Sequence, residues 1–360
     1  LKEIEDPKSF FDSLKKIHFQ SFIEFVFFRT NHINRLQNRP DENNDPFNFY
    51  LKLSQFIQSE QNLKYKLIFC SIPTRLEKYI DYRIHTKSQD NIHFNSAQFF
   101  ENLNSRPPLW IRLNHLDKKT ELINELQKEN YTHSFSPKEN VLEISGQKSV
   151  FLLESFQKGF FEIQDYASTE IVDTFDPYKG SYVWDACAGG GGKTIHIASK
   201  LMNKGVIYAT DIREYKLGEI KSRAKKAQFF NIRTQVWDGV KLPIFGKEIH
   251  NHGGFDFILV DAPCSSSGTW RRNPDAKYRI EKKNIEELTQ LQSMLLTHAS
   301  QMLHPNGTLI YATCSFFTEE NERIVEHFLK LNTNMKVILQ KLLGSPTHNS
   351  DSMFVAVFRK

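Results

Sequence analysis

A loop of four consecutive glycines, Gly189 to Gly192, constrains the fold of this chain more than any other feature. An apolar segment ending at Trp184 precedes the loop, and apolar residues at helical spacing follow Lys193. This order of strand, loop and helix lets backbone N–H groups approach a ligand closely, because glycine has no Cβ atom to hold the ligand off. The stretch from Tyr182 to Thr194 therefore predicts a cradle for a small ligand rather than a flexible surface turn.

The spacing excludes two familiar nucleotide loops. A Walker loop ending at Thr194 would need glycine where Cys187 stands, and a dinucleotide loop starting at Gly189 or Gly190 would need a third glycine that the sequence lacks. The pattern that remains is an acidic residue, Asp185, followed by small residues at alternating positions. This pattern resembles the cofactor loop of S-adenosylmethionine-dependent methyltransferases.

The composition indicates a soluble globular protein. The chain of 360 residues suffices for two or three domains, with 39% hydrophobic and 25% charged residues. No run of about 18 apolar residues could span a membrane, and no signal peptide is evident, although a start at Leu1 suggests missing initial residues. We expect a cytoplasmic monomer that does not contact membranes.

The cysteines and histidines indicate neither a disulfide framework nor a metal site. Four cysteines lie far apart without a Cys-x-x-Cys pair, and thirteen histidines show no ligand spacing. We expect reduced thiols and no metal. The cysteines are Cys70, Cys187, Cys264 and Cys314.

The net charge of +5 is mild support for a polyanionic partner, and the clustering of basic residues says more. One cluster crowds a predicted helix and comprises Lys216, Lys221, Arg223, Lys225 and Lys226. The other follows Cys264 and comprises Arg271, Arg272, Lys277, Arg279, Lys282 and Lys283. Each residue alone is best explained as part of a solvated face, but two clusters beside one site favour phosphate contact. We expect Arg271, Arg272, Lys277 and Arg279 to bind RNA.

The chain divides into three predicted units. Residues 1–103 form a helical N-terminal region, with helices near 9–29, 47–59, 60–71 and 73–81, and Cys70 is expected in its core. Residues 104–160 form a small α/β unit similar to an RNA-recognition motif. Such sheets often present a face to single-stranded RNA, and Trp110, Tyr131 and Phe135 could stack on bases, although such residues are more often core.

Residues 161–360 alternate strands with helices, which predicts a Rossmann-like domain with a mostly parallel seven-stranded sheet. Predicted strands lie at 182–184, 206–210, 234–237, 257–260 and 308–313. A last strand, 353–358, is expected to be antiparallel at the edge. Ligands of such sheets bind at the carboxyl ends of the strands.

Four strands end in chemically notable residues, Asp211, Asp238, Asp261 and Cys314. Cys264 follows Asp261 by three residues, and Thr318 is predicted to cap a helix whose first turn contains Glu319, Glu320 and Glu322. In a parallel sheet these turns share the edge that holds the glycine loop. Two thiols, a carboxylate and a methyl donor are thus expected together.

This combination has a specific chemical use. Carbon 5 of a pyrimidine is too weak a nucleophile to attack a sulfonium methyl unaided, but a thiolate that adds to carbon 6 makes the ring nucleophilic. A carboxylate beside ring nitrogen 3 stabilises the adduct and favours cytosine, provided that it can share a proton there. A second cysteine can assist the release of the first.

With these motifs the chain resembles the Sun (Fmu, RsmB-type) family of RNA cytosine-5 methyltransferases from about residue 104 to the end. The resemblance rests on Asp185-Ala186-Cys187-Ala188 with Gly191-Gly192-Lys193-Thr194, on Asp261-Ala262-Pro263-Cys264, on Arg271-Arg272-Asn273-Pro274 and on Thr313-Cys314-Ser315. Segments 106–114 and 164–168 also look like family segments.

The resemblance implies that Cys314 is the nucleophile, that Cys264 assists product release, and that Asp261 and Lys193 belong to the catalytic set. It implies S-adenosylmethionine contacts from Cys187, Ala188, Gly189, Gly190, Gly191, Gly192, Lys193, Asp211 (ribose), Asp238 (adenine) and Asp261. Asp185 contacts the cofactor or caps the loop. Gly190 stands where the family usually has proline, and the N-terminal region lacks a clear match to the family's RNA-binding extension, which leaves the choice of RNA open.

Several functions are compatible with these observations. The first is methylation of cytosine carbon 5 in bacterial ribosomal RNA, with transfer RNA as the second substrate choice. A non-catalytic RNA-binding or ribosome-assembly factor is another, but a decayed site would be expected to lose Cys264 or Cys314. A nicotinamide-dependent oxidoreductase is disfavoured by the failed dinucleotide spacing.

Overall fold

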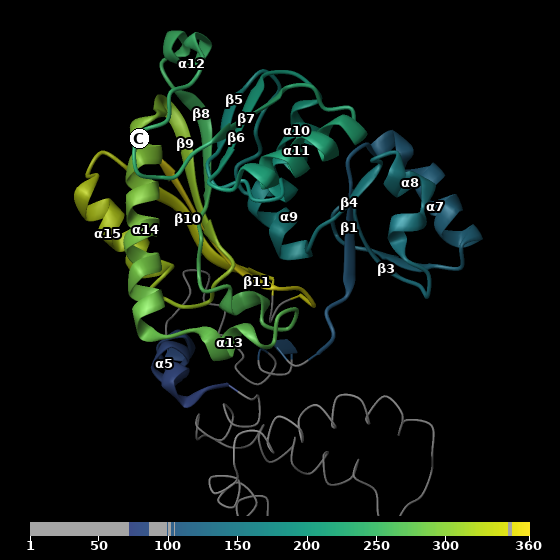
Figure 1. Cartoon of the computed structure of the whole chain (residues 1–360), viewed down its shortest axis with the longest axis horizontal. Coiled ribbons are helices and arrows are strands. Elements are labelled where there is room, and N and C mark those ends of the chain that lie inside the picture. Colours follow the sequence, from purple (N-terminus) through teal and green to yellow (C-terminus); the bar gives the residue numbers. More distant parts are fainter. Residues whose placement is uncertain (1–71, 86–98, 100–101, 104, 345–347) are drawn as a thin grey trace, which may run out of the picture.

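The computed structural model describes residues 72–85, 99, 102–103, 105–344 and 348–360 (Figure 1). The helices expected near 9–29, 47–59 and 60–71, together with Cys70, lie outside these residues. The helix expected near 73–81 is present as η1 (Thr74–Leu76) and α5 (Glu77–His85).

A seven-stranded sheet forms the centre of the molecule, in the order β10-β11-β9-β8-β5-β6-β7. Its strands are β5 (Tyr182–Asp185), β6 (Val206–Asp211), β7 (Ile232–Val236), β8 (Phe255–Asp261), β9 (Leu303–Thr313), β10 (Lys336–Gly344) and β11 (Ser352–Arg359). The neighbours from β9 to β7 pair in parallel, whereas β11 is antiparallel to both β9 and β10. The predicted mostly parallel seven-stranded sheet is confirmed.

Helices cover both faces of this sheet (Figure 1). One face packs against α9 (Tyr166–Asp173), α10 (Gly192–Leu201) and α11 (Glu214–Lys226), and the other against α12 (Lys247–His252), α14 (Lys282–Gln301) and α15 (Glu322–Leu331). On each face of the sheet, apolar side chains of the strands and of the covering helices form one cluster. Two short elements, η4 (Ser267–Thr269) and α13 (Ala276–Arg279), follow β8.

The position predicted for the last strand is wrong. β11 is antiparallel as expected, but it lies inside the sheet, and the edge strand is β10, which we did not predict. The apolar pattern of β10 is broken by Lys336, Gln340 and Lys341, as suits a strand with one unpaired side. β11 is buried over seven of its eight residues, as expected of an interior strand.

A second sheet of four antiparallel strands precedes the large one, in the order β2-β3-β1-β4. It comprises β1 (Leu109–Leu113), β2 (Thr132–Phe135), β3 (Val141–Ser145) and β4 (Phe161–Ile163), with η2 (Leu116–Lys118), α7 (Lys119–Lys128), η3 (Val150–Leu152) and α8 (Glu154–Gln157). The chain order is β-α-β-β-α-β, the split βαβ arrangement. A likeness to an RNA-recognition motif stays a prediction.

The face of the small sheet that contains Trp110 packs against the rest of the molecule. The ring of Trp110 lies 5.2 Å from that of Tyr166 on α9, and the fully buried Arg112 donates to Ser199 on α10 at 3.3 Å. Tyr131 is buried as well, whereas Phe135 is 56% exposed. Of the three aromatic residues considered for base stacking, Phe135 alone is open to solvent.

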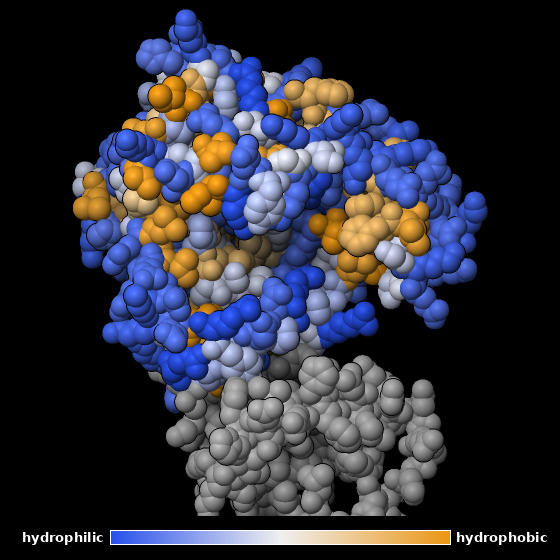
Figure 2. All heavy atoms as spheres, in the orientation of Figure 1, coloured by the Kyte–Doolittle hydropathy of each residue, from blue (hydrophilic) through white to orange (hydrophobic). Residues whose placement is uncertain are grey.

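The surface of the described part is predominantly hydrophilic on the face shown in Figure 2, where apolar side chains gather in small groups. None of the helices within the described residues is long and apolar enough to cross a membrane.

Candidate active site

The glycine loop between β5 and α10 adopts backbone conformations that require glycine. Gly189 and Gly191 have φ angles of +52° and +84°, in the left-handed region that side chains disfavour. A Cβ atom on Gly191 would lie 2.7 Å from Cγ1 of Ile220 on α11, so this glycine also lets the loop pack against that helix. Ala188 donates its N–H to the carbonyl of Thr210 at 2.8 Å, which joins the loop to the end of β6.

Arg223 of α11 holds the loop from the opposite side. Its guanidinium donates to the carbonyl of Gly190 and forms an ion pair with Glu162 of β4 at 3.0 Å. Arg223 therefore connects the glycine loop with the small sheet. We predicted it as one of several outward basic residues, because Glu162 lies 61 positions earlier and no local pattern indicates the pair.

Asp185, the last residue of β5, is buried beneath the loop. Its Oδ2 accepts a hydrogen bond from the Thr194 hydroxyl at 2.6 Å, and its Oδ1 has no partner among the described residues. Burial raises the pKa of Asp185 to about 7. Neither of the two expected roles describes this geometry, because the carboxylate braces the first turn of α10 instead.

A cavity of about 560 Å³ opens where the loop meets the carboxyl ends of the strands. The predicted cofactor contacts that line it are Cys187, Gly189, Lys193, Asp211, Asp238 and Asp261, and both Cys264 and Cys314 line it as well. The remaining predicted contacts, Ala188, Gly190, Gly191 and Gly192, lie in the loop beside this cavity. Residues from the ends of five strands, β5 to β9, thus converge on one space, as the parallel topology predicts.

Asp211, at the end of β6, presents a carboxylate that is held by several N–H groups. It accepts hydrogen bonds from the N–H of Gly189 and from the N–H and side chain of Arg213, at distances between 2.9 and 3.2 Å. Burial opposes ionisation, but these hydrogen bonds outweigh it and lower the pKa of Asp211. The group is therefore an ionised acceptor, as contact with ribose hydroxyls requires.

Asp238 lines the same cavity two residues beyond the end of β7. Its Oδ1 accepts the N–H of Val240 at 2.9 Å, which orders the loop. Trp237 and Leu295 line the cavity beside it and give this part an apolar wall. An acceptor next to an apolar wall suits a flat heteroaromatic ring such as adenine.

The two predicted catalytic cysteines lie in contact in the wall of the cavity. Cys264 follows β8 and Cys314 follows β9, and their sulfur atoms are 3.3 Å apart. The Oγ of Ser266 lies 3.4 Å from the sulfur of Cys314. The N–H of Gly268 donates to the Cys314 carbonyl at 2.9 Å, which ties the two turns together.

The environment distinguishes the three described thiols. The hydrogen bond with Cys264 lowers the pKa of Cys314, and the same bond together with burial raises the pKa of Cys264 well above its ordinary value. Burial also raises the pKa of Cys187 well above its ordinary value. Cys314 is therefore the thiol that most readily becomes a thiolate, the form that acts as a nucleophile.

Lys193 and Asp261 form an ion pair beside these sulfur atoms, with Nζ and Oδ2 2.6 Å apart. Burial alone would lower the pKa of Lys193, but the pairing with Asp261 outweighs it and raises that pKa. A cation and a carboxylate therefore occupy the wall of the cavity together, and the lysine ammonium can donate a hydrogen bond to a group bound beside Asp261.

Glu320 is a structural residue that the sequence did not reveal. We predicted it in the first turn of a helix capped by Thr318, but α15 begins at Glu322, and Glu320 is fully buried behind the thiols. Its carboxylate accepts the N–H and hydroxyl of Ser265 at 2.8 and 2.5 Å and the amide of Gln292 at 3.2 Å. Glu320 thereby fixes the Cys264 turn against the segment that follows Cys314.

Three of the four basic residues expected to bind RNA are buried in the protein or paired with its own acidic residues. Arg271 is buried and donates to the Ser350 carbonyl at 3.0 Å, and Lys277 is buried too. Arg272 forms ion pairs with Asp165 and Asp351 at 2.6 and 2.7 Å. For Arg271 and Lys277 the expected contact with RNA is corrected to a role in packing, because their charged groups do not face solvent.

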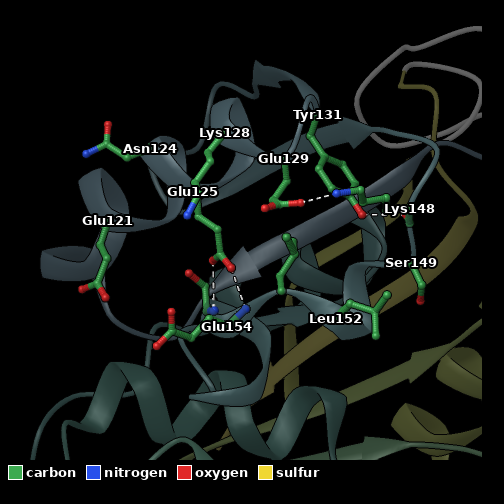
Figure 3. A pocket seen from close by; sticks show the side chains of 12 residues that line it. Glu121, Asn124, Glu125, Lys128, Glu129, Tyr131, Lys148, Ser149, Leu152 and Glu154 are labelled. Atoms are coloured by element: carbon green, nitrogen blue, oxygen red, sulfur yellow. Dashed lines mark hydrogen bonds and ion pairs between the residues drawn. The ribbon is translucent and has the colours of Figure 1, made fainter.

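A second cavity, of about 440 Å³, lies in the small unit between α7 and η3 (Figure 3). Its carboxylates are already engaged, because Glu125 accepts the N–H groups of Glu154 and Ser155, and Glu129 pairs with Lys148 at 2.6 Å. No cysteine lines it. The first cavity is therefore the candidate active site.

The fold and the site together define a Rossmann-like methyltransferase. The fold has counterparts among solved structures. A crystal structure described as PH0851 is 29% identical, with a TM-score of 0.70 over 87% of this chain and 72% of that chain. The structure of NSun6 from Pyrococcus horikoshii with SFG is 21% identical, with a TM-score of 0.66 over 80% of this chain and 98% of that chain.

Sequence comparison identifies the family. The family described as 16S rRNA methyltransferase RsmB/F matches residues 172–359, and the chain belongs to it. Ribosomal RNA small subunit methyltransferase B from Enterobacter sp. (strain 638) is 34% identical over 236 residues, which are 64% of this chain and 53% of that protein. The chain thus spans about half the length of the curated relatives that it matches. The family predicted from the motifs is confirmed.

S-adenosylmethionine is the cofactor of this family, and the first cavity fits it. The cradle at Gly189, the ionised Asp211 and the apolar wall by Trp237 provide surroundings for its amino acid, ribose and adenine parts. Within the described residues, no three His, Cys, Asp or Glu side chains are grouped so that they could hold a metal ion.

Proposed function

We propose that this chain transfers a methyl group to carbon 5 of a cytosine in RNA, with ribosomal RNA as the substrate. The observation that supports this most is the pair of sulfur atoms 3.3 Å apart, in the same cavity as the Lys193–Asp261 ion pair. A fold that only bound RNA would have no need for a thiol with a lowered pKa beside a buried ion pair.

Cys314 acts as the nucleophile in this proposal. Its thiolate forms a bond to carbon 6 of the cytosine, and the electron pair of the double bond between carbons 5 and 6 moves to carbon 5. When bound, S-adenosylmethionine supplies an electrophilic methyl group to that carbon. The Asp261 carboxylate accepts a hydrogen bond from the exocyclic amine of the base, and the Lys193 ammonium beside it donates one to nitrogen 3.

Cys264 assists the end of the reaction. Transfer of the proton on carbon 5 to water returns its electron pair to the double bond between carbons 5 and 6, the bond between carbon 6 and sulfur breaks, and Cys314 leaves as a thiolate. Cys264 remains a neutral thiol because its pKa is raised, so it can donate a hydrogen bond to the departing sulfur. This division of labour follows from the opposite directions of the two pKa shifts.

RNA reaches the site over a surface whose exposed ion pairs can exchange their acidic partner for a phosphate group. Arg279 is 72% exposed and pairs with the exposed Asp275. Such surface pairs contribute at most about 1 kcal/mol, so a phosphate can replace the aspartate at little cost. Arg279 is therefore the predicted basic residue that is freest to contact RNA, and the contact expected of Arg272 stays a prediction.

The test is product analysis. The full chain is incubated with methyl-labelled S-adenosylmethionine and either a 16S ribosomal RNA transcript or transfer RNA, and the digested nucleosides are separated by mass. We expect labelled 5-methylcytidine from the ribosomal transcript, and none from a Cys314→Ser variant that still binds the cofactor, because a hydroxyl is a far poorer nucleophile than a thiolate.

Other products would decide between the alternatives. Label in transfer RNA alone would favour the second substrate choice. Label on another base, or an unchanged yield from Cys314→Ser, would refute the proposed chemistry.

A further inference from the structure

The segment before the small sheet packs against the chain that follows both cysteines. Residues of η1 and α5, with Phe99 and Leu103, form an apolar cluster with Trp270, Phe316 and Phe317. Phe316 and Phe317 are the second and third residues after Cys314. In Figure 1, α5 lies beside α13 and the adjoining end of α14. The N-terminal segment therefore contacts the loop that positions the nucleophile.

Arg83 of α5 makes the polar contact in this interface. Its Nε donates to the Phe316 carbonyl at 2.7 Å, and its two terminal nitrogens each donate to one carboxylate oxygen of Glu322 at 2.7 Å. The side chain of Arg83 is 5% exposed. A bidentate pair in this setting is geometrically strict, because both charges are largely removed from water.

Aromatic contacts hold the same loop from α5 and from Phe99. The ring of Tyr79 lies 5.1 Å from Phe317, and the ring of Phe99 packs edge-on against Phe316 at 4.9 Å. The loop between Cys314 and α15 is thus fixed at its middle by Arg83 and the rings, and at its start by the N–H of Gly268.

We infer that Arg83 is a positioning residue for the Cys314 nucleophile, so that the N-terminal segment forms part of the active-site scaffold. The inference rests on the proposed function of Cys314. Its physical basis is that the Phe316 carbonyl is two residues from the attacking sulfur and cannot move without moving it. A displacement of about 1 Å at a reacting atom can cost about a hundredfold in rate.

Arg75 provides a matched control, because it also docks this segment. Its guanidinium donates to the carbonyls of Tyr278 and Ile280 at 2.5 and 2.9 Å. These carbonyls belong to α13 and the residue after it, and not to the loop after Cys314. Arg75→Met therefore loosens the docking of the segment without releasing Phe316.

The experiment measures single-turnover methyl transfer at saturating RNA and cofactor in the full chain, together with the rate at which iodoacetamide alkylates Cys314, read by peptide mass. For Arg83→Met we expect transfer to fall about a hundredfold, with unchanged cofactor affinity and slower alkylation of Cys314. Arg83→Lys should regain part of the rate, and Arg75→Met should stay within about threefold of the parent chain.

Thermal melting checks the fold, and Glu322→Gln, which weakens the same pair from the other side, replaces Arg83→Met if that variant does not fold. Equal losses in the Arg83 and Arg75 variants, or no loss in either, would overturn the inference. If the parent chain transfers no methyl group, the proposed function fails, and slower alkylation in Arg83→Met alone would still support the positioning role.

Discussion

A single hydrogen bond between two sulfur atoms separates the roles of Cys264 and Cys314. Two thiols 3.3 Å apart in a buried cavity cannot both ionise, because two negative charges at that distance repel strongly. The bond lowers the pKa of Cys314 and raises that of Cys264. Lys193 adds a positive charge on the side of Cys314. These opposite shifts are what the proposed mechanism requires of a nucleophile, Cys314, and of a neutral donor, Cys264.

The raised pKa of Asp185 makes the free energy of unfolding depend on pH. Its pKa rises from 3.8 to about 7 on folding, so the stabilisation from its proton is complete below about 3.8 and is lost as the pH rises through about 7. Relative to Asp185→Asn, which keeps an acceptor for Thr194, the parent chain should gain about 2 to 3 kcal/mol of unfolding free energy between about pH 8 and about pH 5.

Urea unfolding of both chains at these two pH values measures that difference. An unfolding free energy difference that stays constant with pH would mean that folding does not raise the pKa of Asp185, and the account of its burial beneath the glycine loop would be wrong.

At the scale of elements, the glycine loop and α11 determine each other's position. Gly191 lies against Ile220 of α11, while Arg223 from the same helix binds the Gly190 carbonyl. The loop can reach these two contacts only with a left-handed residue at position 191. The cradle for the cofactor is therefore built from one helix packing against one turn.

Gly191→Ala should weaken the binding of S-adenosylmethionine about tenfold or more. An alanine there has a left-handed backbone conformation that costs roughly 1 to 2 kcal/mol, and its Cβ atom would meet Ile220 at 2.7 Å. Gly190→Ala is the matched control, because Gly190 has no left-handed backbone and its Cβ atom would meet only side-chain ends, Glu219 at 3.1 Å and Arg223 at an ordinary 3.6 Å. Calorimetric titration of both variants tests this, and equal affinities would show that α11 does not constrain the loop.

Periodicity predicted the elements that have strong local patterns. The alternation of apolar strands and helices indicated the parallel sheet, and the ends of its strands indicated Asp211, Asp261 and Cys314 as neighbours in space. The edge strand β10 was missed because Lys336 and Lys341 interrupt its apolar pattern. Its place in the sheet depends on pairing with β11 and not on its own residues.

The sequence could not predict which charged residues are used inside the molecule. Arg83, Arg223 and Arg271 look like surface cations, but each has partners more than 60 positions away in the chain. Glu320 lies in a run of acidic residues that resembles a helix start, and its burial depends on Ser265 and Gln292. Long-range pairs of this kind leave no periodic signal.

At the scale of the whole molecule, three parts of the chain meet around one cavity. The large sheet supplies the thiols and acids, the small sheet reaches the glycine loop through Glu162 and Arg223, and α5 holds the loop after Cys314 through Arg83. The small sheet also covers α9 and α10 with its Trp110 face. On the proposed function, RNA therefore approaches the cavity from another side than this sheet face.

The most direct test of this account is the covalent bond between Cys314 and RNA. Cys264→Ala removes the thiol that assists release, so the full-length variant should accumulate a protein–RNA adduct that survives denaturing gels during turnover with S-adenosylmethionine. Digestion and peptide mass analysis should locate the modified cytosine on Cys314, and Cys264→Ala with Cys314→Ser should form none. An adduct on another residue, or no adduct while methyl transfer continues at the parent rate, would contradict the account.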